Sequence, residues 1–204
     1  WGIDLNNTRY QPNSTIDASN AAQLALKWVY GLSTDTPRSY PYVTEDTIFV
    51  GDAGRGVVAL DRETGCERWV FAHEGYIASA LLHAKVDGKE VLVFNDRIEG
   101  VYAIDAVTGE FVWHAVLDEG PIPWFSGTPV IYGNRVYVPI ASQEVGLAIN
   151  PLYGCCTTSG GLAAFDLATG KKVWYLRTIK EPVLQTGERW FFVQEYGPSG
   201  APVW

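Results

Sequence analysis

The sequence predicts an all-β protein made of β-propeller blades, from a repeated motif, its period and the strand pattern around it. The motif Ala-x-Asp-x-x-Thr-Gly-x-x-x-Trp occurs three times, in Val57–Trp69, Val101–Trp113 and Leu162–Trp174. A period near 44 residues with about four strands per repeat is typical of a propeller blade. Helical repeats would need apolar residues at i, i+3, i+4 and i+7, a pattern that these segments lack.

Each motif predicts two strands joined by a tight turn. An alternating apolar strand ends in the aspartate, the turn Asp-x-x-Thr-Gly follows, and a second strand ends on the tryptophan. Asp and Thr side chains can accept hydrogen bonds from backbone N–H groups in the turn, while Gly adopts a positive φ. We expect the tryptophan ring to fill the space between neighbouring sheets.

The spacing of the repeats shows where the pattern is interrupted. The motif aspartates Asp61, Asp105 and Asp166 lie 44 and 61 residues apart, so the last interval carries an insertion of 17 residues. Three upstream segments fit further strands of the same blades: Thr47–Val50, Val91–Phe94 and Arg135–Val138.

The chain is expected to be one partial propeller domain over residues 1–204. Its blade repeats end near Trp28, Trp69, Trp113 and Trp174, which makes three to four blades. A closed ring takes about 4–8 blades, so an unpaired sheet edge would remain exposed. We therefore expect the chain to belong to a larger propeller or to associate with other chains through its open edges.

Composition excludes several classes of function. The chain has 23 acidic and 15 basic residues, a formal charge of -8, which disfavours nucleic acid as a partner. No apolar run approaches the roughly 18 residues that cross a bilayer, so no membrane span is expected.

The histidines His73, His83 and His114 have no metal-ligand spacing and are expected to be ordinary residues. The absence of methionine and the ends at Trp1 and Trp204 suggest a processed chain, a trimmed chain or a fragment.

Beyond the repeats, three stretches carry a family resemblance. The opening WGIDLNNTRY, with the later Lys27-Trp28, resembles the start of pyrroloquinoline-quinone (PQQ) alcohol dehydrogenases. CCTTSGGLAAFDLATGKKVW and GPSGAPVW resemble the polyvinyl-alcohol dehydrogenase branch of this quinoprotein family. The resemblance covers essentially the whole chain and implies the N-terminal part of an eight-bladed propeller with tryptophan-motif blades. It also implies the cofactors PQQ and Ca²⁺, an alcohol substrate and a cytochrome c electron acceptor.

The first site that the resemblance implies lies around the insertion. Family members place a Thr/Ser-Gly-x-Pro strand eighteen positions before Glu-x-Gly, and this chain has Ser126-Gly127-Thr128-Pro129 and Glu144-Val145-Gly146 at that spacing. By this match Ser126 and Ser142 bind PQQ and Glu144 binds calcium, which prefers carboxylate oxygens. The alternative is that Glu144 is a solvated loop residue.

Two further elements resemble the faces of the family's quinone site. Cys155 and Cys156 are adjacent, and in relatives a strained vicinal disulfide packs against PQQ. Trp204 follows a glycine-rich segment and matches a tryptophan that stacks on the other face of the quinone. The alternatives are a pair of buried thiols and one more structural tryptophan.

A loop arginine and two departures complete the comparison with the family. Arg38 is a candidate for binding a PQQ carboxylate, the alternative being a solvated arginine. Relatives have an arginine soon after the cysteine pair, where this chain has Thr157-Thr158-Ser159. The family's calcium-binding asparagine and catalytic aspartate lie beyond the equivalent of Trp204. No catalytic base is therefore assigned, and the chain by itself is expected to be inactive.

Two functions remain in competition. The first is a quinoprotein alcohol dehydrogenase that oxidises secondary alcohols such as polyvinyl alcohol, in the periplasm or outside the cell, where a disulfide would persist. The second is a non-catalytic propeller that serves as a scaffold or binding module, as in the outer-membrane assembly member of the same repeat class. The cysteine pair, the spacing of Glu144 and the glycine-rich tail favour the enzyme. The departure after the cysteines and the short length favour the scaffold.

Overall fold

The computed structural model of the protein describes residues 6, 8, 10–34, 37–77, 79–117, 123–125, 127–147, 149–150, 152–153, 158–179, 184–190 and 193–197. The chain divides into two compact units, Trp1–Tyr30 and Gly31–Trp204. The described part of the first unit contains the 3-10 turn η1 (Ala21–Gln23) and no strand. The interpretation of Trp28 as the end of a further blade therefore stays a prediction.

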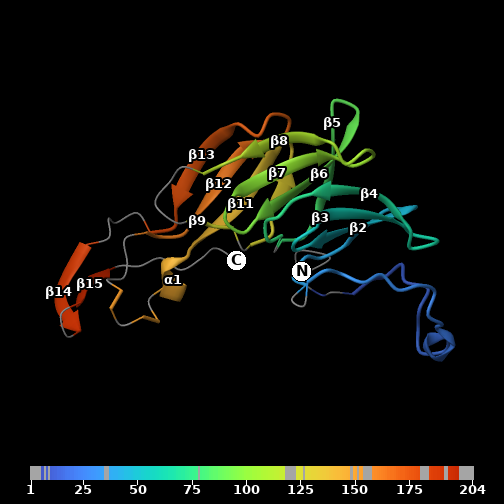
Figure 1. Cartoon of the computed structure of the whole chain (residues 1–204), viewed down its shortest axis with the longest axis horizontal. Coiled ribbons are helices and arrows are strands. Elements are labelled where there is room, and N and C mark those ends of the chain that lie inside the picture. The colour runs from blue at the N-terminus through green and yellow to red at the C-terminus, as the bar shows by residue number, and fades with distance from the viewer. Residues whose placement is uncertain are drawn as a thin grey trace. The chain divides into compact units, whose positions relative to one another are not determined.

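The second unit contains three antiparallel sheets that correspond to propeller blades (Figure 1). Blade 1 consists of β1 (Tyr42–Val43), β2 (Thr47–Asp52), β3 (Gly56–Asp61) and β4 (Glu67–Ala72). Blade 2 consists of β5 (Leu82–Val86), β6 (Lys89–Asp96), β7 (Gly100–Asp105) and β8 (Phe111–Ala115). Blade 3 consists of β10 (Val130–Tyr132), β11 (Arg135–Ser142), β12 (Gly161–Asp166) and β13 (Lys172–Arg177).

Three smaller elements accompany the blades. The short strand β9 (Pro123–Trp124) pairs with the end of β11, and the helical turn α1 (Glu144–Leu147) follows that strand. A hairpin of β14 (Leu184–Trp190) and β15 (Val193–Gly197) forms a separate two-stranded sheet. The prediction of an all-β, partial propeller is confirmed, and the three predicted upstream strands lie within β2, β6 and β11.

The repeated motif forms the same turn in all three blades. In each copy the aspartate Oδ1 accepts the backbone N–H of the motif threonine, at 2.8, 2.9 and 3.1 Å. The threonine hydroxyl accepts the N–H two residues on, at 3.3, 3.2 and 3.3 Å. The motif glycines Gly65, Gly109 and Gly170 have φ values of 74°, 75° and 70°, which only glycine adopts at little cost.

The motif tryptophans lie inside the second strand, so the expectation that this strand ends on them was wrong. In each blade the motif tryptophan is the third residue of its strand, and pairing continues beyond it; these residues are Trp69, Trp113 and Trp174. The strands extend because β4, β8 and β13 stay paired with the preceding strand beyond the tryptophan, as far as Gly56, Val101 and Gly161. Pairing with the neighbouring strand, and not the tryptophan, therefore sets where each strand ends.

Blade 2 is buried on both faces, which explains its near-continuous apolar strands. Successive side chains of β7 point to opposite faces. Val101 and Ala103 pack toward blade 3, while Tyr102 and Ile104 pack toward blade 1. The two clusters make the inter-blade cores, and both faces of this sheet contribute to them.

Candidate functional site

Each blade has two ends, and the hairpin end is where the three blades differ. In blades 1 and 2 the second and third strands are joined by short turns, residues 53–55 and 97–99. In blade 3 the paired strands part at Ile140 and meet again at Gly161, so residues 141–160 form the connection. The predicted insertion therefore emerges from the end of the blade opposite to the motif turns.

Glu144 opens the helical turn inside this insertion, and its side chain is fully buried. The Tyr153 hydroxyl donates to Oε1 at 2.8 Å. The backbone N–H of Thr158 donates to Oε2 at 2.5 Å, and the Thr158 hydroxyl donates to the same oxygen. Burial of a carboxylate is costly unless hydrogen-bond donors or a cation compensate its charge. The three donors from Tyr153 and Thr158 do this, and they also hold Glu144 in a defined orientation. The alternative of a solvated loop glutamate is inconsistent with this burial.

Ser142 joins the same group from the last position of β11. Its hydroxyl lies 2.5 Å from the Thr158 hydroxyl and accepts the backbone N–H of Glu144 at 3.2 Å. Ser142 and Thr158 are both buried. We refer to Ser142, Glu144, Tyr153 and Thr158 as the Glu144 cluster.

Tyr153 is the least buried member of the Glu144 cluster. The hydrogen bond to Glu144 and partial burial raise the pKa of Tyr153 above its ordinary value. The phenol therefore stays protonated at neutral pH and acts as a donor to the carboxylate. This fixes one oxygen of Glu144 from the solvent side.

A tryptophan and an arginine lie next to the cluster. Trp124 of β9 is paired with Ala141, and its ring packs against the helical turn at Gly146, where an added Cβ would lie 3.9 Å away. The Arg97 guanidinium lies 4.0 Å from the centre of the Trp124 ring and 5.4 Å from that of Tyr76. Trp124 Nε1 is buried and donates to no acceptor in the described part of the chain. The cluster is thus flanked by one unused donor and one stacked cation.

Of the residues that the sequence nominated, the structure brings Ser142 and Glu144 together. Arg38 is exposed in the segment before β1, where no described group contacts its guanidinium. Ser126, Cys155, Cys156 and Trp204 lie outside the described residues, so their roles stay predictions.

Sequence reasoning missed Thr158, Tyr153, Trp124 and Arg97. Thr158 was identified as a departure from the family, because relatives have an arginine near this position. A polar residue in the same connection as Glu144 is a candidate hydrogen-bond partner for that glutamate, and this signal could have found it. Arg97 carried no motif signal, because its position depends on the β6–β7 turn coming close to β9.

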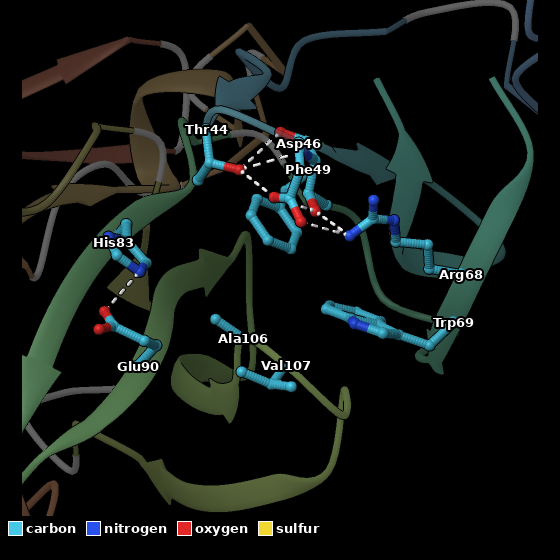
Figure 2. Close-up of a pocket in the computed structure, with 10 residues that line it drawn as sticks. Thr44, Asp46, Phe49, Arg68, Trp69, His83, Glu90, Ala106 and Val107 are labelled. Atoms are coloured by element: carbon cyan, nitrogen blue, oxygen red, sulfur yellow. Dashed lines mark hydrogen bonds and ion pairs between the residues drawn. The ribbon is translucent and has the colours of Figure 1, made fainter. Parts of the chain in front are cut away.

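A cavity of about 310 Å³ lies at the opposite, motif-turn end of the junction between blades 1 and 2 (Figure 2). Its apolar wall includes Phe49 and Trp69, whose ring centres are 5.7 Å apart. Arg68 on its rim donates to Asp46 at 2.8 Å, and His83 pairs with Glu90 at 2.9 Å. The charged groups in this cavity already pair with one another, and none of the nominated site residues lines it.

No helix among the described residues is both long and apolar enough to cross a membrane.

Comparison with known proteins places the chain among PQQ-repeat proteins. The family model described as "Outer membrane protein assembly factor BamB" matches residues 12–194. A polyvinylalcohol dehydrogenase of Sphingopyxis sp. (strain 113P3) is 31% identical over all of this chain, and one of a Pseudomonas sp is 28% identical. The chain spans 32% of the length of each of these relatives.

Solved structures agree with the fold. The quinohemoprotein alcohol dehydrogenase of Comamonas testosteroni superposes with a TM-score of 0.66 at 25% identity. The superposition covers 87% of this chain and 26% of that protein. A second quinohemoprotein alcohol dehydrogenase, ADHIIG of Pseudomonas putida HK5, gives the same TM-score at 24% identity and supports the fold.

Proposed function

Because the chain belongs to the quinoprotein family of PQQ-repeat propellers, we propose that it forms the cofactor-binding part of a PQQ-dependent alcohol dehydrogenase. The observation that carries the proposal is the buried Glu144 cluster inside the one expanded blade hairpin. The two polyvinylalcohol dehydrogenases match along this whole chain, so polyvinyl alcohol or a related secondary alcohol is the proposed substrate.

The residues present fit a calcium ion and a quinone. Ca²⁺ takes six to eight oxygen ligands and prefers carboxylates, and Glu144 is a buried carboxylate whose orientation is already fixed. Trp124, whose Nε1 donor is unused, packs against the helical turn that Glu144 opens, and the Arg97 guanidinium stacks on its ring. PQQ carries three carboxylates, so a site with one cation and one free donor next to the metal ligand suits it.

The chain's own residues would bind and orient the two groups. Glu144 would contribute one carboxylate to the calcium shell, while Thr158 and Tyr153 hold that carboxylate in place. Ser142 would bind the quinone, as would Ser126, and Arg97 would pair with a carboxylate of the cofactor. When bound, PQQ supplies the carbonyl group that accepts hydride from the alcohol, and Ca²⁺ polarises that carbonyl.

Cys155, Cys156, Trp204 and Arg38 complete the proposed set of cofactor contacts. A disulfide between the two cysteines on one face and the Trp204 indole on the other would enclose a flat quinone. Such a disulfide would persist in the periplasm or outside the cell, where we place the protein. A cytochrome c is the proposed electron acceptor, in line with the relative named 1-butanol dehydrogenase (cytochrome c).

A scaffold role is the second candidate, because the matching family model bears the name of an assembly factor. A scaffold blade has no use for a fully buried glutamate held by three donors. The Glu144 cluster is therefore the feature that separates the two functions.

The test is to add Ca²⁺ and PQQ to the protein. Binding is monitored by the absorbance of the quinone and by quenching of tryptophan fluorescence. We expect Glu144→Gln to abolish the calcium dependence of PQQ binding, because the amide removes the anionic ligand but keeps the shape. Glu110→Gln, in a motif turn at the other end of a blade, is the matched control and should bind as the parent does. A parent protein that binds neither group would overturn the enzyme proposal and leave the scaffold.

A further inference from the structure

A second group of ligand-type side chains lies at the hairpin end of blades 1 and 2. His73 follows the last residue of β4 in blade 1, Asp96 is the last residue of β6 in blade 2, and Glu99 lies in the turn that follows it. One ligand atom from each of the three residues lies within 4.8 Å of the others. His73 and Asp96 are largely buried and Glu99 is exposed, so the group opens to solvent on one side.

Asp96 is fixed so that one oxygen is directed at His73. Its Oδ1 accepts the backbone N–H groups of Ile98 and Glu99, both at 2.8 Å. Its Oδ2 lies 3.1 Å from His73 Nε2. Burial raises the pKa of Asp96, but the hydrogen bonds from His73 and the two N–H groups outweigh it and hold the pKa below its ordinary value. The carboxylate is therefore charged at neutral pH.

Glu99 and His73 are positioned by aromatic neighbours. The Tyr102 hydroxyl donates to Glu99 Oε2 at 2.7 Å, which leaves Oε1 for another partner. The His73 ring packs against Tyr102 with ring centres 4.8 Å apart. Hydrogen bonds and packing of this kind behind a ligand are what orient metal-binding side chains in proteins.

Gly75 lies against both ligand atoms, and its lack of a side chain is what allows the backbone to pass so close to them. A Cβ at this position would lie 2.1 Å from Asp96 Oδ2 and 2.2 Å from His73 Nε2. Any side chain there would occupy the point where the two ligand atoms converge. Two atoms of a tetrahedral zinc shell lie about 3.3 Å apart, given metal–ligand distances of about 2.0–2.1 Å, which is close to the His73–Asp96 separation.

We propose that His73, Asp96 and Glu99 bind a divalent transition-metal ion, with Zn²⁺ as the best match, and that this ion joins blade 1 to blade 2. One imidazole and two carboxylates form a borderline donor set that suits Zn²⁺ better than Ca²⁺, which prefers oxygen alone. A small shift of Glu99, which is exposed, would bring its oxygen into the shell, and water completes it. Because the ligands come from two sheets, the bound ion cross-links them.

The site is separate from the Glu144 cluster and does not depend on the proposed dehydrogenase function. Its test is calorimetric titration of the chelator-treated protein with Zn²⁺, after its free thiols have been alkylated. We expect one ion per chain, a rise in melting temperature on binding, and little heat with Ca²⁺.

The variants are Glu99→Gln, His73→Gln and Gly75→Ala. We expect each to weaken Zn²⁺ binding at least tenfold. Glu99→Gln is the decisive one because Glu99 is exposed, so the change should leave the melting temperature of the metal-free protein unaltered. Gly75→Ala displaces the Asp96 and His73 ligand atoms without removing a ligand.

His83→Gln is the matched control, since His83 also pairs with a glutamate, at 2.9 Å, but is not part of this group. It should bind Zn²⁺ like the parent, as should Glu144→Gln. The proposal is overturned if the parent binds no Zn²⁺, if Glu99→Gln binds like the parent, or if Glu144→Gln abolishes the binding.

Discussion

The two ends of each blade behave differently. At the motif end the same Asp–Thr–Gly turn recurs three times, with matching hydrogen bonds and glycine φ values. At the hairpin end blade 1 has a short turn, blade 2 has Asp96 at the end of β6 followed by a turn with Arg97 and Glu99, and blade 3 has the insertion with Glu144. The repeat builds the scaffold, and both of the ligand sites that we propose lie at the end where the blades depart from one another.

The largest expected effect at the motif end comes from its tryptophans. Trp113 is 6% exposed, its Nε1 donates to the Leu167 carbonyl at 3.0 Å, and its ring covers Gly170 of the next blade. Trp113→Ala should lower the free energy of unfolding by about 4 kcal/mol, the cost of emptying a buried aromatic site. Trp174, 40% exposed, occupies the same motif position in blade 3.

Urea unfolding of Trp174→Ala provides the comparison for that prediction. We expect a loss of about 1 kcal/mol in the free energy of unfolding, because the Trp174 ring buries much less surface than the Trp113 ring does. Equal losses for the two variants would show that the motif tryptophan does not act by filling the space between blades.

The motif glycines should come next in size. Gly109 has φ of 75°, and an added Cβ would lie 2.6 Å from the Trp69 ring. Gly109→Ala should therefore cost about 2–3 kcal/mol, from backbone strain and from displacement of the ring. Gly88 has φ of 84° with nothing within 4 Å, so Gly88→Ala should cost only the strain, about 1 kcal/mol. Thermal unfolding of both variants separates the two contributions, and equal costs would exclude the contact with Trp69.

A smaller, pH-dependent effect is expected from the motif aspartates. Burial raises the pKa of Asp105, but the N–H groups of Thr108 and Val107 and the Thr108 hydroxyl outweigh it and lower the pKa below 3.8. A carboxyl with a lowered pKa in the folded state stabilises the fold above its unfolded pKa, and this stabilisation is lost as pH falls through the folded pKa.

Asp105→Asn should accordingly cost about 1 kcal/mol at pH 7, and that cost should shrink as the pH falls below about 4. The measurement is the free energy of unfolding of parent and variant between pH 7 and pH 3. A cost that stays constant over this range would mean that the charge of Asp105 does not contribute.

The sequence was sufficient for the motif end but only partly for the hairpin end. The turn chemistry is local, so Asp61, Thr64 and Gly65 could be interpreted from their spacing. The insertion also follows from the irregular period, and Glu144 from its resemblance to the family. Tyr153 and Thr158 could not be assigned, because their contacts with Glu144 depend on the path of the connection between β11 and β12. Arg97 could not be assigned because it meets Trp124 only after the β6–β7 turn has packed against β9. The group of His73, Asp96 and Glu99 was missed for the same reason, since its members come from two blades.

The extent of the motif strands was predicted less well. Pairing carries β4 and β8 past the motif tryptophan, to Ala72 and Ala115. The length of a strand depends on the partner it pairs with, and a motif in one strand does not contain that information.

The most direct test of the division between the two ends uses a pair of Thr→Val variants. Thr108 lies in a motif turn and Thr158 in the Glu144 cluster, and both changes remove a hydroxyl while keeping the shape. The measurement is the affinity for PQQ in the presence of Ca²⁺, together with the free energy of unfolding. We predict that Thr158→Val weakens binding at least about tenfold, while Thr108→Val costs about 1 kcal/mol of stability and binds like the parent. If the two variants bind PQQ equally well, whether both bind like the parent or both lose affinity, the result would contradict the account.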